Sequence, residues 1–208
     1  MNDEKDVNEM VLSRERLELR SAIAAFAPCN EQEEADKLVI LRALDNNPHC
    51  FDRSEQAHMA CSIWVIDPTM TQTLLVYHNI YDSWSWIGGH ADGEADLEAV
   101  ALRELQEETG VEHARIVTCG PGDIYSLEVL TVDGHEKRGC YVSSHLHLNV
   151  TYLAVANPDE PIRVKPDENS GVRWAPLADA IRLSTEPWIR ERIYRKLIGK
   201  LQHIRLDG

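Results

Sequence analysis

A helix is predicted between residues 96 and 110, and its apolar face becomes acidic in its last turns, which limits the folds that can accommodate it. At about 100° per residue, one stripe of this helix collects four apolar side chains, Leu97, Val100, Ala101 and Leu105. Glu104 and Glu108 fall inside the same stripe, and Glu107 lies beside them. The face that should pack on a core therefore ends in a group of carboxylates.

This placement of the carboxylates is energetically unfavourable. Like charges four residues apart cost about 0.2–0.5 kcal/mol, and anions in the last turn of a helix cost about 0.3–1 kcal/mol. Arg103 is expected to reach Glu107 one turn on, but one cation cannot neutralise three anions. The face is either a solvated glutamate surface or the wall of a cleft that holds hard divalent cations, which bind oxygen ligands. We favour the cleft, since carboxylates that point towards a core must be paired or bound to metal.

The segment before the helix favours the cleft. Residues 86–90 leave a predicted strand through Gly88 and Gly89, and glycine permits tight turns and the close approach of a ligand. The carbonyl of Gly89 is a candidate metal ligand. A glycine pair alone indicates only a turn, so the prediction depends on the acidic helix that follows.

Composition narrows the class of ligand. The 208 residues carry a net charge of −14, which argues against binding of a nucleic-acid polymer through basic side chains. A phosphate ligand would therefore need a divalent cation to hold it.

The five cysteines are odd in number and widely spaced, which favours reduced thiols in the cytoplasm. The acidic first ten residues lack the apolar core of a secretory signal, and we predict no membrane span.

Periodicity predicts helices and strands that alternate along the chain. Predicted helices cover 13–26, 30–43, 97–108 and 187–202, and the second opens with a capping box at Asn30 and Glu33. Predicted strands cover 57–65, 73–77, 114–119, 125–132, 140–156 and 171–177, with a hairpin turn at 133–134 and a loop at 157–170. This order predicts an α/β fold in which helices sandwich a mixed sheet. We divide the chain into an N-terminal helical extension, 1–50, and a main domain, 51–208.

Residues 89–111, GHADGEADLEAVALRELQEETGV, resemble the Nudix box, G-x5-E-x7-R-E-U-x-E-E-x-G-U with U aliphatic. The second half matches at every fixed position, and the spacing from Gly89 to Arg103 is that of the family. One position departs from the pattern: Ala95 stands where the first glutamate is expected, and Glu94 precedes it. In the family this glutamate is mainly supportive, so the departure concerns the geometry of the loop more than metal binding.

The resemblance implies a Nudix-type α/β/α sandwich and a pyrophosphohydrolase that cleaves a nucleoside diphosphate linked to another group. The implied cofactor is Mg²⁺, with Mn²⁺ as a substitute. We assign Glu107, Glu108 and the Gly89 carbonyl as metal ligands. Glu104 is expected to coordinate the metal or to deprotonate the attacking water, and Arg103 to hold Glu107 and the loop.

Residues outside the box compete for the remaining roles. Strand geometry places His145, His147, Asn149 and Thr151 on one face of the strand. That face is predicted either to line a substrate pocket or to be an ordinary polar surface, and the pair of histidines could instead form a separate metal site. Glu168 resembles the acidic loop residue that some family members use as a base. Trp86 and His90 are candidates for substrate contacts.

Two other functions remain open at this stage. A Nudix-fold sensor would bind a nucleotide without turnover, although the complete glutamate set argues against it. Chemistry like that of isopentenyl-diphosphate isomerase needs a placed cysteine, which Cys61 or Cys119 could supply. The expected partner is a small diphosphate substrate, and the N-terminal helices could mediate a homodimer.

Overall fold

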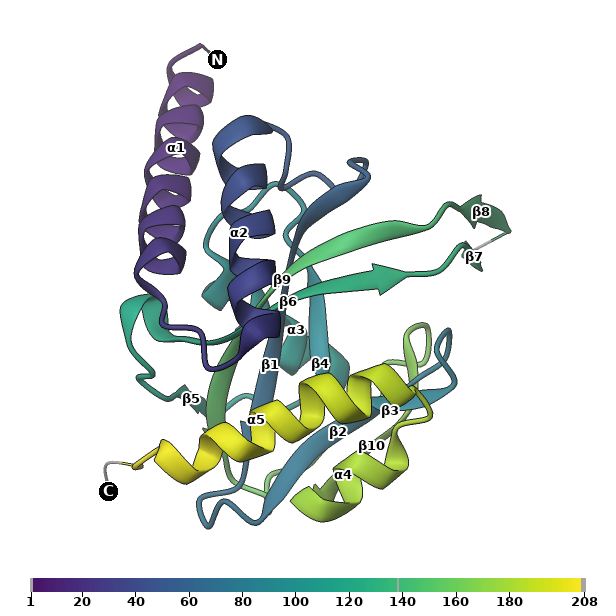
Figure 1. Ribbon diagram of the computed structural model, residues 1–208. Coiled ribbons are helices and arrows are strands. Elements are labelled where there is room, and N and C mark those ends of the chain that lie inside the picture. Colours follow the sequence, from purple (N-terminus) through teal and green to yellow (C-terminus); the bar gives the residue numbers. More distant parts are fainter. Residues whose placement is uncertain (1, 138, 207–208) are drawn as a thin grey trace.

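The computed structural model describes residues 2–137 and 139–206, and in it helices flank both faces of a mixed sheet (Figure 1). The α-helices are α1 Asn2–Ala25, α2 Glu31–Asn46, α3 Leu97–Thr109, α4 Leu177–Leu183 and α5 Arg195–Lys200. Shorter helical turns are η1 Pro121–Asp123, the π-helical η2 Ile189–Tyr194 and η3 Leu201–His203. The strands are β1 Ala57–Ile66, β2 Gln72–His78, β3 Ser83–Ser85, β4 Ile87–His90, β5 Ala114–Ile116, β6 Ile124–Val132, β7 His135–Lys137, β8 Cys140–Val142, β9 His145–Ala156 and β10 Asn169–Pro176.

The main sheet is organised around β1 and β9. These two strands are parallel, and the other pairings in this sheet are antiparallel in the order β10-β2-β1-β9-β5. Three further strands join at the sides, since β3 pairs with β2, β4 with β1 and β6 with β9. The predicted mixed sheet is therefore confirmed.

The residues of β1 divide between two apolar cores because successive side chains of a strand point to opposite faces. Met59, Cys61 and Ile63 join the core formed with α1, α2 and α3, whereas Trp64 and Ile66 join the core formed with α4 and the C-terminal helical turns. In Figure 1, α3 lies behind the sheet and α5 crosses in front of it. The α/β/α sandwich thus follows from the alternation within its central strand.

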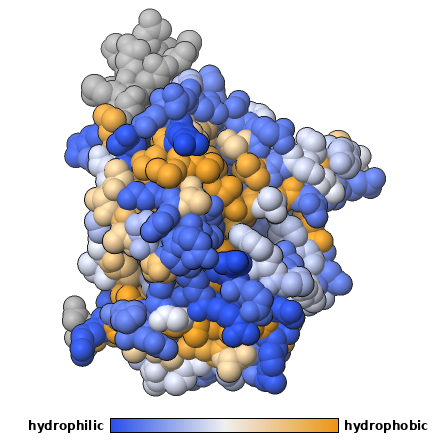
Figure 2. All heavy atoms as spheres, in the orientation of Figure 1, coloured by the Kyte–Doolittle hydropathy of each residue, from blue (hydrophilic) through white to orange (hydrophobic). Residues whose placement is uncertain are grey.

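The N-terminal helices pack on the same core as the sheet. Asn30 caps α2 by accepting a hydrogen bond from the Glu33 amide, and the Glu33 carboxylate accepts one from the amide of Cys29. This arrangement is close to the predicted capping box, with the return bond one residue earlier. Apolar residues gather over this helical part of the surface (Figure 2), and Leu17 and Leu38 are among the exposed ones. The division at residue 50 stays a prediction.

Several predicted boundaries differ from the structure. Residues 133–134 do not close the hairpin; they interrupt its ladder, which resumes as β7 and β8 and projects from the sheet (Figure 1). The predicted helix 187–202 is present as one continuous helical run, which changes from π-helical in η2 to α-helical in α5 and to 3₁₀ in η3, whereas α4 was not predicted. Residues 177–183 make only about two turns, which is too short a segment for an apolar period to be recognised.

Within the described ranges, none of the helices combines the length and the apolar character that crossing a lipid bilayer requires.

Candidate active site

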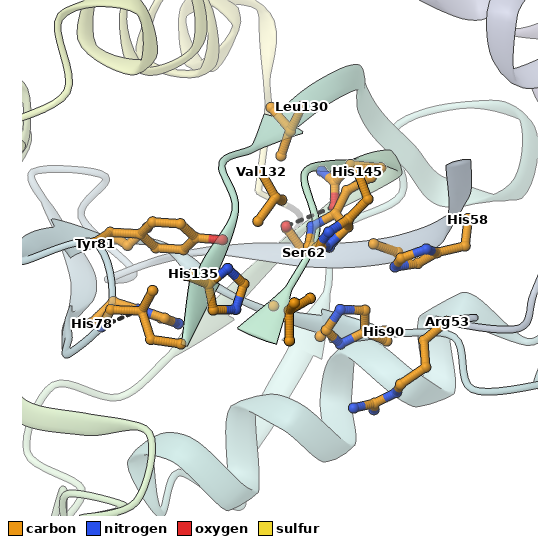
Figure 3. Close-up of a pocket in the computed structure, with 18 of the residues that line it drawn as sticks. Arg53, His58, Ser62, His78, Tyr81, His90, Leu130, Val132, His135 and His145 are labelled. Atoms are coloured by element: carbon orange, nitrogen blue, oxygen red, sulfur yellow. Dashed lines mark hydrogen bonds between the residues drawn. The ribbon is translucent and has the colours of Figure 1, made fainter. Parts of the chain in front are cut away.

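A cavity of about 490 Å³ opens where the end of β4 meets α3 and the β6–β9 hairpin. Its lining includes Glu104, Glu108 and Glu168 as well as a set of histidines, some of which Figure 3 shows around the opening. The cavity therefore brings together the acidic helix, the glycine pair and the polar face of β9, three features that the sequence analysis singled out separately.

Three carboxylates form one group in this cavity. Glu104 and Glu108 come from α3 and Glu168 from the loop before β10, and one carboxylate oxygen of each lies within 4.8 Å of the others. Glu108 is buried, whereas Glu104 and Glu168 are half-buried. The structure therefore gathers Glu168 with the two box glutamates across 60 residues of sequence.

This crowding perturbs the acidity of the group. Burial raises the pKa of Glu104 to about 7, although the Lys165 ammonium partly offsets it. Burial, the Glu104 charge and the Glu168 charge raise the pKa of Glu108 to about 8, against a backbone hydrogen bond from Gly88. In the absence of a cation, the pair therefore retains protons near neutral pH.

The two glycines allow the backbone to approach the glutamates. A Cβ at Gly89 would lie 2.3 Å from Oε1 of Glu104, and one at Gly88 would lie 2.5 Å from the carbonyl oxygen of Cys61. Gly88 therefore requires glycine, because the clash there is with backbone, whereas a side chain at Gly89 would have to displace the Glu104 carboxylate. The close contact keeps the Gly89 backbone beside the carboxylate group.

The expected pairing of Arg103 with Glu107 is wrong. Arg103 instead donates from both terminal nitrogens to the Glu94 carboxylate, at 3.1 and 2.7 Å. Ala95, which occupies the box position, is buried in the core. The loop thus turns Glu94 towards the arginine and buries the alanine, which explains the one-residue departure from the box.

Glu107 lies outside the group of three carboxylates. It is half-exposed and accepts a hydrogen bond at 2.8 Å from Lys165, which lowers the pKa of its carboxyl group. The same ammonium lies 3.0 Å from the Glu168 carboxylate. Lys165, to which the sequence analysis gave no role, therefore connects the helix to the loop before β10.

A second group at the cavity consists of four histidines. His58, His90, His145 and His147 each offer a ring nitrogen, and these nitrogens lie within 4.8 Å of one another. Burial is the main cause that lowers the pKa of His147 to about 2, and burial also lowers the pKa of His58. Both rings are therefore neutral imidazoles at neutral pH. The sequence analysis missed His58, because a histidine near the start of an apolar strand carries no motif.

The rest of the polar face of β9 is buried. Asn149 and Thr151 donate hydrogen bonds to the Glu128 carboxylate at 2.9 and 2.7 Å, and Lys196 lies 2.8 Å from the same residue. Of the four polar residues predicted on this face, His145, His147 and Asn149 line the cavity, and Thr151 belongs to this network beneath it.

The remaining candidates have mixed surroundings. Trp86 lines the cavity but is only 8% exposed, and its ring packs edge-on against Tyr194. Cys61 also lines the cavity, with Sγ 3.8 Å from the Gly89 carbonyl oxygen, and burial raises the pKa of its thiol to about 12. Cys119 packs against the opposite core, so Cys61 is the cysteine that approaches the box.

An α/β/α sandwich whose acidic helix faces a glycine pair is the architecture of the Nudix hydrolases. Residues 56–197 match the NUDIX domain, and the chain belongs to this family. The predicted family and fold are confirmed, and so is the predicted class of enzyme at the level of the family.

The similar proteins are named for more than one substrate. The bis(5'-nucleosyl)-tetraphosphatase [asymmetrical] of Rattus norvegicus is 30% identical over 103 residues, which is 49% of this chain and 60% of the relative. The match thus spans three fifths of that relative's length. A C. elegans Ap4A hydrolase in a binary complex superposes with a TM-score of 0.51 and 22% identity, over 70% of this chain and 98% of the other. The E. coli dihydroneopterin triphosphate pyrophosphohydrolase has a TM-score of 0.50 and 14% identity, over 68% of this chain and 95% of the other.

Proposed function

We propose that this chain is a metal-dependent hydrolase that cleaves a diphosphate linkage in a nucleoside-diphosphate-type substrate, by attack of water at phosphorus. The observation that carries the proposal is the convergence of Glu104, Glu108 and Glu168 in a cavity beside the Gly88-Gly89 backbone. Such a set of oxygens suits a hard divalent cation and offers little to an anionic substrate without one.

The donor set fits Mg²⁺, with Mn²⁺ as a substitute, because buried carboxylates that repel one another need a cation. Glu104, Glu108 and the Gly89 carbonyl would hold the ion. Glu107 would join them by exchanging the Lys165 ammonium for the metal. Bound Mg²⁺ supplies charge neutralisation for the diphosphate and lowers the pKa of a coordinated water.

The other roles belong to residues of the chain itself. Glu168 is our candidate for the base that accepts the proton of the attacking water, with Glu104 as the alternative. Arg103 is a positioning residue, which fixes the loop after Gly89 through its two hydrogen bonds to Glu94. His90, His145, His147 and Trp86 form the wall at which we place the bound substrate.

Dinucleoside polyphosphates are the first substrates to test, since the rat relative is named as a tetraphosphatase and carries 30% identity over the matched region. A net charge of −14 is consistent with a substrate that arrives together with its own divalent cation. The cytoplasmic location and the homodimer stay predictions, the latter open to light scattering on the full chain.

The decisive experiment incubates the purified chain with Mg²⁺ and a panel of diphosphates in ¹⁸O-labelled water. Label on a phosphorus of one product, located by mass spectrometry, would support hydrolysis and identify the bond that is cleaved. Tight binding without product would favour the sensor, and rearranged isopentenyl diphosphate would favour the isomerase. Either result would overturn the proposal.

A further inference from the structure

The four histidines of the cavity come from three neighbouring strands. His58 on β1 pairs in register with His147 on β9, and His90 on β4 pairs with Ala60, two residues along β1 from His58. His145 lies two residues before His147. Because residues two apart on a strand share a face, this register places all four rings on one side of the sheet.

The carboxylate group belongs to the other side of the sheet. Gly89 pairs with Cys61, which packs in the core shared with α3, and the Gly89 backbone contacts Glu104. His90 is the next residue, so its ring points to the opposite face. The backbone of β4 thus separates the imidazoles from the carboxylates, although one cavity reaches both.

His58 carries a nitrogen that nothing in the described chain satisfies. Its side chain is 1% exposed, and its Nδ1 donates to the carbonyl oxygen of Glu55 at 2.8 Å. That bond fixes the tautomer and leaves a lone pair on Nε2, which is buried without a hydrogen-bond partner. An orphaned buried acceptor is costly, and the ring of His58 points towards His90 and His145 (Figure 3).

His145 repeats this arrangement. Its Nδ1 lies 2.9 Å from the Ser143 carbonyl oxygen, as a donor, and its Nε2 lies 3.2 Å from Nε2 of His147. Histidines that bind metals typically donate their other ring N–H to a carbonyl or carboxylate, which orients the ring and makes the free nitrogen more basic. Two of the four histidines are therefore already arranged as metal ligands.

We propose that His58, His90, His145 and His147 form a second metal site, which binds a divalent transition metal of the zinc class. Imidazole is a favoured ligand of Zn²⁺, Cu²⁺, Fe²⁺ and Ni²⁺, whereas Mg²⁺ prefers the oxygens on the other side of β4. The ion satisfies the orphaned nitrogen of His58 and replaces the contact between two ring nitrogens of His145 and His147. An ion bound there would stand at the wall where we place the substrate, and its binding does not require the hydrolase activity of the chain.

In the test, the full chain is stripped of metal with a chelator, freed of the chelator and supplied with Zn²⁺, and the bound ion is then measured directly. We expect about one tightly bound Zn²⁺ per chain by elemental analysis, and multiple imidazole ligands in the zinc X-ray absorption spectrum. A double variant, Glu104→Gln with Glu108→Gln, removes two of the acidic-helix ligands and should retain this ion. Zn²⁺ should also raise the melting temperature of that variant, because the ion binds the folded state.

The single variants His145→Gln and His90→Gln should each weaken Zn²⁺ binding at least tenfold. Loss of a residue that only supports a metal ligand already has an effect of about this size. His113→Gln is the matched control, since His113 is exposed and lies outside the group. Circular dichroism checks that each variant folds. If His90→Gln does not fold, the zinc affinity of His145→Gln alone tests the proposal. Zinc affinity in His145→Gln equal to that of the control, or a spectrum with oxygen ligands alone, would overturn the proposal.

Discussion

Glu108 shows how one side chain can cost stability and supply function. It is 5% exposed, and it lies against Glu104 and Glu168 with its pKa raised to about 8 by burial and by these charges. An uncharged isostere needs no retained proton and places no charge against these neighbours. We expect Glu108→Gln to lower kcat by about 10²–10⁴-fold, and the free energy of unfolding without metal to stay equal or rise by about 1 kcal/mol.

Turnover with Mg²⁺ and urea unfolding with a chelator would measure the two effects on the same samples. Glu112→Gln is the control, because Glu112 follows the same helix and is exposed. Unchanged turnover in Glu108→Gln would remove this residue from the metal site, whatever its effect on stability.

A substitution at Gly89 tests the contact between the β4 backbone and the Glu104 carboxylate. A methyl group there would lie 2.3 Å from Glu104 Oε1, so Gly89→Ala must displace either the carboxylate or the strand. We expect a loss of about 10²-fold in kcat/KM, the typical effect of a displacement near 1 Å at a reacting centre. Gly199→Ala is the control, because a Cβ at Gly199 meets no atom within 4 Å. Equal activity of the two variants would mean that Glu104 does not need its observed position.

At the scale of elements, the acidic helix could be predicted almost completely from sequence. Asp96 caps it, Gly110 ends it with φ of 79°, and its apolar stripe packs as the 3.6-residue period indicates. The sequence did not predict which basic side chain pairs with each carboxylate. Arg103 pairs with Glu94, and Lys165 pairs with Glu107. Those partners depend on loop conformations, which have no periodicity to read.

The histidine group was beyond prediction for a related reason. His145 and His147 were expected to share a face, but His58 joins them only through the parallel register of β1 with β9, about 90 residues apart. A strand pairing at this separation leaves no mark on either segment alone. The same holds for Glu33 in α2, whose partners Ser126 and Lys200 lie on β6 and α5.

Glu33 makes α2 part of the fold. It is fully buried, 2.9 Å from the Lys200 ammonium and 3.5 Å from that of Lys196; burial alone would raise its pKa, but these two charges lower it to about 2. Because the folded-state pKa is depressed, its stabilisation is present above about pH 4.5 and is lost as the pH falls towards 2. We expect Glu33→Gln to lower the free energy of unfolding by about 3–5 kcal/mol at neutral pH.

Urea unfolding of Glu33→Gln beside Glu34→Gln checks this prediction, since Glu34 is the exposed neighbour on the same helix. The deficit of the first variant should shrink below about pH 4. Equal stabilities at neutral pH would mean that α2 is not held by its buried carboxylate.

Across the whole molecule, β1 and β4 separate two groups that differ in ligand chemistry. Oxygens of α3 and of the loop before β10 lie on one side, and nitrogens of three strands lie on the other. The sequence predicted Glu104 and Glu108 of the first group together because both belong to one helix. The second depends on the assembled sheet, so the two sites should respond independently to chelators, to Mg²⁺ and to Zn²⁺.

Proton linkage provides a test of the carboxylate group in the intact protein. Glu104 and Glu108 have folded-state pKa values near 7 and 8, above the ordinary value of 4.5, so without metal the folded chain binds more protons than the unfolded chain between these limits. Their contribution to the stability of the metal-free protein is therefore fully present below about pH 4.5, decreases as the pH rises, and is lost above about pH 8.

Mg²⁺ must displace the retained protons, so its affinity should rise by up to about tenfold per pH unit for each proton released, and level off above about pH 8. Calorimetric titrations in buffers of different ionisation enthalpy count those protons. Release should disappear in the Glu104→Gln and Glu108→Gln double variant, and a Mg²⁺ affinity that is flat from about pH 6 to about pH 8.5 would show that these carboxylates are already ionised without the metal.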